Sequence, residues 1–202
     1  MSNAQRNRWQ AGLTLIELMV VVAIVGILMV VATVTIRRKP QARDMAFQVA
    51  NLVRETSRKA VAGGAVNPEV VEAFGISART RMRIFTDGVT NYEVAVLERL
   101  VDPPLPTAPS WEELTRRFIG NTGIDVAGYR ADADLDGGLG STSPMAPGDE
   151  LEIRCYPDGS CDGDIVTDGL QGMTIYFEKP GGEKARVAVM PLNTNPRVFG
   201  GW

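Results

Sequence analysis

The feature that most constrains this chain is a long apolar run near its N-terminus. Residues 13–36 read LTLIELMVVVAIVGILMVVATVTI, and Glu17 is the one charged residue among them. As an α-helix, a run of this length extends about 36 Å, which is enough to cross a lipid bilayer with some tilt. The sequence therefore predicts a transmembrane helix over residues 13–36.

This run does not resemble a secretory signal that is removed after export. Such signals have a shorter apolar core, which is followed by a small-residue cleavage site. Here the run is longer, and it continues into Thr33-Val34-Thr35-Ile36 and then a basic triplet at 37–39. We therefore expect the segment to remain in the mature protein as a membrane anchor.

Basic residues flank the run on both sides, so charge alone gives a doubtful orientation. Arg6 and Arg8 precede it, and Arg37, Arg38, Lys39 and Arg43 follow it. By the positive-inside rule this count places the large C-terminal part in the cytoplasm. The two cysteines, Cys155 and Cys161, indicate the opposite, because a small disulfide loop persists outside the reducing cytosol. We favour the outside orientation.

Glu17 is costly where it stands. A charge at the centre of a bilayer costs roughly 2.5–3.5 kcal/mol on insertion scales, and less at one helical turn inside the run. A glutamate that reaches the lipid headgroups is one interpretation. The position alone does not separate this interpretation from a functional one.

The residues around Glu17 resemble the processing motif of type IV pilins and pseudopilins. The segment Gly12-Leu13-Thr14-Leu15-Ile16-Glu17 follows a short basic leader, MSNAQRNRWQAG, and precedes the apolar stretch LMVVVAIVGIL. The resemblance implies that a prepilin peptidase cuts between Gly12 and Leu13 on the cytoplasmic side. It also implies N-methylation of the new Leu13 amine, although the family more often has phenylalanine there. The large domain would then face the periplasm.

The same resemblance implies a role for Glu17 in assembly. A buried amine and a buried carboxylate are each expensive alone and are tolerated mainly as a pair. In the family, the glutamate pairs with the N-terminal amine, most usefully that of a neighbouring subunit. Such a pair between Glu17 and a Leu13 amine would set the axial register of packed helices, as buried polar residues do in coiled coils.

Residues 37–64 predict an amphipathic stem helix. Pro40 interrupts the helix after the basic triplet. Beyond it, apolar and small residues recur at spacings of three and four: Ala42, Met45, Ala46, Val49, Leu52, Val53, Thr56 and Ala60. Gly63-Gly64 ends the pattern. We expect this stripe to pack on the rest of the protein, and a coiled-coil seam is the alternative.

Residues 65–202 predict a β-rich globular domain, so that the whole chain is α+β, with a long N-terminal helix packed on an antiparallel sheet. Strands are expected at 81–86, 91–98, 150–156, 173–178 and 185–191. Turns are expected at Asp87-Gly88 and Pro180-Gly181-Gly182. A short helix is expected in SWEELTRRFIG, residues 110–120, with Ser110 as N-cap and Glu113 in a capping box.

Composition argues against several activities. The chain has no histidine, which removes the commonest general base and the commonest metal ligand. No catalytic constellation is visible, and we predict that the protein is not an enzyme. Residues 102–168 contain fourteen acidic residues and four arginines, which is a poor surface for nucleic acid. Arg79, Arg81 and Arg83, which alternate along one strand, are the remaining candidates for nucleic-acid contacts.

The two cysteines enclose the segment YPDGS, in which Pro157-Asp158-Gly159 favours a turn. We predict a disulfide between Cys155 and Cys161 that staples a hairpin, because the spacing is not that of a C-x-x-C redox motif. The order of this segment and the two strands after it resembles the C-terminal half of the minor pilins and pseudopilins called FimU and GspH. Asn195-Pro196-Arg197-Val198 stands where those proteins often have a Gly-Arg-Val element, and it lacks the glycine.

A calcium site is a further hypothesis. Asp132-Ala133-Asp134-Leu135-Asp136-Gly137 matches the first half of a D-x-D-x-D-G loop. The twelfth position, which should be acidic, is Ser143. An acidic, glycine-rich surface loop without metal is the alternative for Asp132, Asp134 and Asp136, and no other cofactor is expected.

Together these features predict a structural minor pilin in the inner membrane, incorporated at or near the tip of a type IV pilus. A minor pseudopilin of a type II secretion system and a tip module that binds DNA or a surface are the alternatives. The expected partners are other major and minor pilins or pseudopilins, the prepilin peptidase, and the inner-membrane assembly platform.

Overall fold

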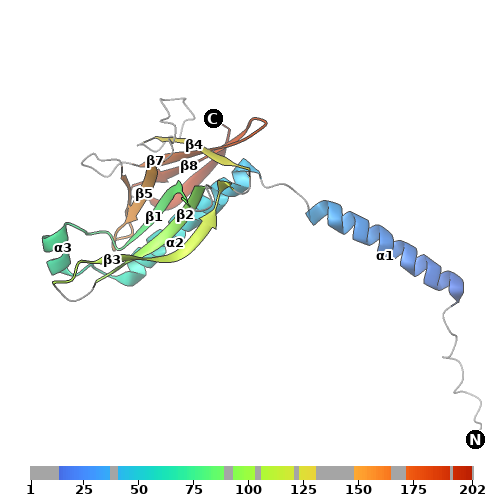
Figure 1. The fold of residues 1–202 in the computed structure, drawn as a ribbon, viewed down its shortest axis with the longest axis horizontal. Helices are drawn as coiled ribbons and strands as arrows, with labels where there is room; N and C mark the ends of the chain where they lie inside the picture. The colour runs from blue at the N-terminus through green and yellow to red at the C-terminus, as the bar shows by residue number, and fades with distance from the viewer. Residues whose placement is uncertain are drawn as a thin grey trace, which may run out of the picture. The chain divides into compact units, whose positions relative to one another are not determined.

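The computed structural model describes residues 14–36, 41–88, 93–102, 106–120, 123–130, 148–164, 172–191 and 193–201. The chain divides into two compact units, Met1–Lys39 and Pro40–Trp202, and each is described by itself. The described part of the first unit is a helix. The second unit combines a long helix and a short one with two antiparallel sheets (Figure 1). The predicted α+β class is confirmed.

Helix α1 spans Leu15–Ile36 and carries Glu17 in its first turn. It has apolar residues on every side, so it lacks the polar face by which a surface helix meets water. Among the residues that the structure describes, no helix meets the combined length and hydropathy requirements of a membrane span.

Helix α2 spans Ala42–Gly63, within the predicted stem of residues 37–64. All eight residues of the predicted stripe are buried, which confirms the amphipathic assignment, and Ala50 and Ser57 join them. The backbone N–H of Gln41 donates to the Asp44 carboxylate at 3.1 Å at the start of the helix. Gly64, with φ 68°, ends it in a backbone conformation that favours glycine.

A five-stranded sheet, here called sheet A, has the strand order β3-β2-β1-β5-β6. Its strands are β1 Thr80–Thr86, β2 Glu93–Val101, β3 Ser110–Phe118, β5 Glu150–Cys155 and β6 Cys161–Asp164. All neighbours are antiparallel, and β1 lies in the centre between β2 and β5. The predicted strands at 81–86, 91–98 and 150–156 are confirmed, with small shifts at their ends.

A four-stranded sheet, here called sheet B, has the order β4-β7-β8-β9. Its strands are β4 Asp125–Arg130, β7 Met173–Lys179, β8 Glu183–Met190 and β9 Asn193–Gly200. Gly181 and Gly182 both have positive φ in the turn between β7 and β8, as predicted. The strands predicted at 173–178 and 185–191 are therefore confirmed as a hairpin.

One continuous core joins the stem helix to both sheets. Helix α2 contacts strands of sheet A and of sheet B, and it runs along the strands in Figure 1. The core combines the α2 stripe with side chains from both sheets, among them Met45, Ile84, Leu97, Ile153 and Phe177. The helix is thus the element that holds the two sheets in one globular unit.

The predicted helix over residues 110–120 is wrong, because these residues form edge strand β3. The strand pairs with β2, so that Leu100 faces Trp111 and Val101 faces Ser110. A register shift leaves Leu114 as an extra residue, a β-bulge that turns its side chain to the core. Ser110 and Glu113 have the spacing of a capping box, which explains the wrong prediction, but here they are residues of the edge strand.

Three described elements were not predicted: helix α3, spanning Pro68–Phe74, and strands β4 and β9. Strand β6 is the second strand of the predicted hairpin around the cysteines. Helix α3 has clear local signals, since the Asn67 side chain accepts the Glu69 N–H at 3.0 Å and Pro68 occupies the first turn. Its Val70 packs with Val66 and Leu100 in a small second cluster.

Candidate assembly site

The N-terminus of α1 is closed by a reciprocal cap between Thr14 and Glu17. The Thr14 N–H donates to the Glu17 carboxylate at 2.8 Å, and the Thr14 hydroxyl donates to the same oxygen at 3.0 Å. The Glu17 N–H lies 3.3 Å from the Thr14 hydroxyl oxygen. This is the capping-box arrangement, in which threonine and glutamate satisfy each other's free backbone groups. Glu17 therefore has a local role in starting the helix.

The carboxylate of Glu17 also borders an apolar surface. A groove of about 340 Å³ on α1 is lined by Ile16, Glu17, Val20 and Val21. The predicted cleavage residues Gly12 and Leu13 lie outside the described residues. The described geometry places one carboxylate at the end of an otherwise apolar helix.

The side chains of α1 are uncovered along its described length. The exposed fraction is 78% at Leu15 and 65% at Met29, and the large apolar residues between them are all at least 44% exposed. An uninterrupted apolar surface of this kind is stable only when lipid or other protein covers it. Helix α1 therefore requires an apolar environment that covers its side chains.

The predicted disulfide between Cys155 and Cys161 is present, and both cysteines are buried. It joins neighbouring strands β5 and β6 of sheet A. The loop that it closes is attached to the stem, because the Ser57 hydroxyl of α2 donates to the Gly159 carbonyl at 3.2 Å. The Cys161 N–H donates to the Pro191 carbonyl at 3.1 Å, which also ties the loop to the end of β8. The disulfide thus lies where α2 and both sheets meet.

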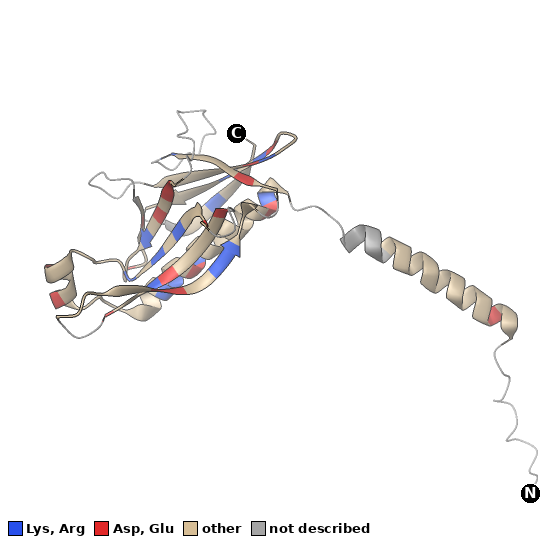
Figure 2. Ribbon diagram, viewed as in Figure 1, with Lys and Arg blue, Asp and Glu red and all other residues tan. Residues whose placement is uncertain are grey.

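The arginines predicted for nucleic acid are each paired with a carboxylate. Arg79 pairs with Asp102, Arg81 with Glu98 and Glu152, and Arg83 with Glu98 and Glu150. Basic and acidic residues alternate across the strands of this face in Figure 2. The Arg83 guanidinium lowers the pKa of Glu150, mainly by a hydrogen bond. The face is therefore balanced in charge, which weakens its attraction for phosphates.

Glu93 is a feature of the body that sequence reasoning missed. Its carboxylate, at the start of β2, accepts the Val126 N–H of β4 at 2.7 Å and so connects sheet A to sheet B. Burial raises the pKa of Glu93 to about 7, against the lowering effect of the Val126 N–H, and the charge of Asp125 raises it further. No motif marks this residue, because its environment depends on the approach of the two sheets.

The proposed calcium ligands Asp132, Asp134 and Asp136 lie outside the described residues, so this hypothesis stays a prediction. Within the described ranges, no group of three or more cysteine, aspartate and glutamate side chains is placed to hold a metal ion.

Comparison with known proteins identifies the N-terminal segment. Residues 10–33 match a family model described as the prokaryotic N-terminal methylation motif. No curated protein and no solved structure matches the chain. The chain thus carries the type IV prepilin-like signal, which supports a pilin-like protein of a pilus or pseudopilus with other pilins and a prepilin peptidase as partners.

Proposed function

We propose that this protein is a structural minor pilin, incorporated near the tip of a type IV pilus, where it helps to initiate assembly. The methylation motif over residues 10–33 is the observation that carries the proposal. In this proposal, residues 1–12 are the leader, residues 13–36 anchor the chain in the inner membrane, and residues 65–202 face the periplasm.

Processing is the first step. The prepilin peptidase cuts after Gly12 on the cytoplasmic side, and the new N-terminal amine of Leu13 is methylated. The amine then lies four residues before Glu17, and one residue before the Thr14 that caps α1. Cleavage therefore creates a positive charge beside a helix terminus that already holds a carboxylate.

Assembly follows from the uncovered surface of α1. Neighbouring subunits cover this apolar surface with their own helices, and the inner-membrane assembly platform brings them together. In such a dry environment a lone carboxylate is strongly unfavourable, whereas an amine and a carboxylate compensate each other. We infer that Glu17 pairs with the Leu13 amine of a neighbouring subunit while Thr14 holds its carboxylate at the helix end.

The body supports a structural role in the periplasm. Its disulfide suits an oxidising compartment. The charged face of sheet A that carries Arg81 and Arg83 is neutralised by internal ion pairs, which favours a scaffold over a DNA-binding tip. We propose no catalytic activity for it. A minor pseudopilin of a type II secretion system uses the same N-terminal chemistry and is the alternative assembly.

The mature N-terminus tests the processing step. Mass spectrometry of the protein from producing cells is expected to give a chain that begins at Leu13 and carries one methyl group on its amine. A chain that keeps its leader, or that is cut at another bond, would overturn the proposal. Substitution of Gly12 by a larger residue is the control, and it is expected to leave the leader attached.

Substitution of the glutamate tests the assembly step. Glu17→Ala is expected to leave expression and leader cleavage intact but to abolish incorporation into sheared filaments, because the Leu13 amine loses its partner. Glu72→Ala, an exposed carboxylate on α3, is the matched control and should incorporate normally. Normal incorporation of Glu17→Ala would refute the amine–carboxylate pair.

A further inference from the structure

The stem and the body of this chain carry opposite charge. Residues 37–64 contain seven basic and two acidic residues, whereas residues 65–202 contain twelve basic and 21 acidic residues. Helix α2 brings part of the basic stem into the same folded unit as the acidic body. Opposite charges that face different directions on one molecule favour contacts between molecules.

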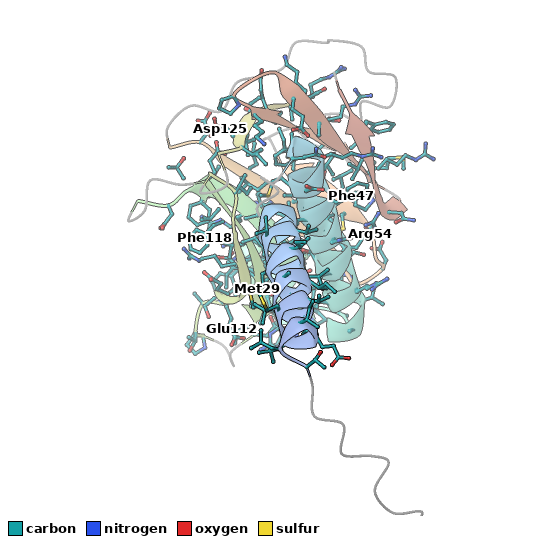
Figure 3. All side chains as sticks on the ribbon, turned by 90° about the vertical axis from the view of Figure 1, so that its right-hand side faces the viewer. Met29, Phe47, Arg54, Glu112, Phe118 and Asp125 are labelled. Atoms are coloured by element: carbon teal, nitrogen blue, oxygen red, sulfur yellow. A yellow bond between two sulfur atoms is a disulfide. The ribbon has the colours of Figure 1, made fainter. Side chains whose placement is uncertain are left out.

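The basic part of α2 forms a ridge on its outer side. Arg43, Phe47, Arg54 and Arg58 follow one another at intervals of four, seven and four, which places them along one side of the helix. We call these four residues the basic ridge. Phe47 is 43% exposed, and the Arg43 guanidinium lies 5.6 Å from the centre of its ring. Phe47 and Arg54 are labelled along α2 in Figure 3.

The arginines of the ridge have no acidic partner within the described part of the chain, in contrast to those on the outer face of sheet A. Arg43 and Arg58 are exposed and make no ion pair there. Arg54 is fixed by neutral acceptors only, the side-chain oxygens of Asn51 at 2.7 Å and Asn195 at 2.9 Å and the Pro196 carbonyl at 3.2 Å. The ridge therefore keeps its positive charge, and Arg54 holds that charge in a fixed position.

Grooves lie on both sides of the ridge. One, of about 290 Å³, is lined by α2 and by Arg117 of β3, and it includes Gln48 and Glu55. The other, of about 410 Å³, lies between Arg54 and the β9 residues 195–199. Arg117 and Arg197, at the two grooves, are exposed and also lack a carboxylate partner among the described residues. The surface thus combines positive charge, an exposed aromatic ring and recesses that accept side chains.

We propose that the basic ridge is a docking surface for the acid-rich body of a neighbouring subunit in the same assembly. This inference rests on the proposed function, and it names the contact that the stem helix makes. Phosphates of a membrane or a nucleic acid would neutralise the arginines, but they would leave Phe47 in water and the two grooves empty. A protein surface that presents carboxylates around an apolar patch satisfies all three features at once.

A photo-crosslinking residue in place of Phe47 tests the contact in the full chain, in cells that assemble the filament. Benzoylphenylalanine at position 47 keeps an aromatic side chain and is expected to crosslink to another subunit. Mass spectrometry should map the crosslink to a segment of that subunit's globular part with more acidic than basic residues. The same residue in place of Phe74 is the matched control, because Phe74 is 40% exposed on α3 and lies away from the ridge.

Charge reversal then tests the chemistry of the contact. Arg43→Glu together with Arg58→Glu is expected to lower the crosslink yield from position 47 about tenfold, since attraction becomes repulsion at two exposed sites. Arg54 is left unchanged because it supports β9, and thermal melting should confirm that the variant folds.

The outcomes separate this inference from the proposed function. Three outcomes would overturn the proposed docking at the basic ridge and leave the pilin role intact. They are a crosslink yield that charge reversal leaves unchanged, a crosslink to lipid or nucleic acid, and a chain that enters the filament without a crosslink. A chain that never enters the filament overturns the pilin role and the ridge with it.

Discussion

Replacement of Glu93 by glutamine is expected to stabilise the body at alkaline pH. The carboxylate lies half-buried between the sheets, where burial raises its pKa to about 7 and Asp125 adds a second negative charge beside it. In the wild type the Val126 N–H donates to the Glu93 carboxylate at 2.7 Å. Glutamine keeps an oxygen that accepts this N–H, but it carries no charge. The substitution therefore removes the cost of the charge and preserves the connection between the sheets.

The direction of the pH dependence follows from the raised pKa. The folded state binds a proton on Glu93 more tightly than the unfolded state does, where the ordinary pKa is 4.5. The resulting stabilisation is fully present below pH 4.5 and is lost as the pH rises through about 7. The difference between the two pKa values corresponds to about 3 kcal/mol at most. Because water screens the half-exposed carboxylate, we expect about 1–2 kcal/mol.

Urea denaturation of the full chain in non-ionic detergent, followed by tryptophan fluorescence, measures this effect. Glu93→Gln should exceed the wild type in free energy of unfolding by about 1–2 kcal/mol at pH 8 and match it at pH 4. Glu72→Gln, on the exposed side of α3, is the control and should change neither value. Equal differences at both pH values, or a less stable variant at pH 8, would refute the reasoning.

Four further outcomes are expected. Reduction of the disulfide should lower the free energy of unfolding by about 2 kcal/mol, because the closed loop is short; urea titration with and without reductant measures this. Arg81→Met removes a cation from the buried carboxylate of Glu98 and should cost about 2 kcal/mol in thermal melts, part of which Glu98→Leu in the same chain recovers. Thr14→Val removes the hydroxyl of the α1 cap and should speed amide exchange in the first turn about fivefold, equivalent to about 1 kcal/mol. Calorimetry with calcium should show a heat that Asp134→Asn abolishes, and no heat at millimolar calcium rejects that site.

The parts of the fold that the sequence predicts are those with a local and periodic cause. The α2 stripe repeats at intervals of three and four residues over a whole helix, so the buried face of α2 can be predicted without knowing what it packs against. The Pro180-Gly181-Gly182 turn and the hairpin around it depend on a few adjacent residues. The disulfide could be predicted because Pro157-Asp158-Gly159 brings its cysteines together.

The remaining parts depend on tertiary contacts. Ser110 and Glu113 locally match the start of a helix, and only the pairing with β2 shows that this segment is a strand. Burial raises the pKa of Glu93, and the charge of Asp125 on β4, more than thirty residues away in sequence, raises it further. The lack of a carboxylate partner for the ridge arginines among the described residues is visible only in the folded chain.

Ser57, a polar residue in the apolar stripe of α2, fixes how the helix sits on the body. A stripe of alanine, valine, leucine and methionine alone would tolerate a slide of one turn, because similar side chains recur at that interval. The buried Ser57 hydroxyl donates to the Gly159 carbonyl at 3.2 Å, whereas the Thr56 hydroxyl donates to the Leu52 carbonyl of its own helix at 2.7 Å. A slide would break the Ser57–Gly159 hydrogen bond in a dry interior, at about 1–3 kcal/mol for an unsatisfied group. The register of the helix is thereby specified, so the basic ridge meets any neighbouring subunit at a fixed position relative to β3 and β9.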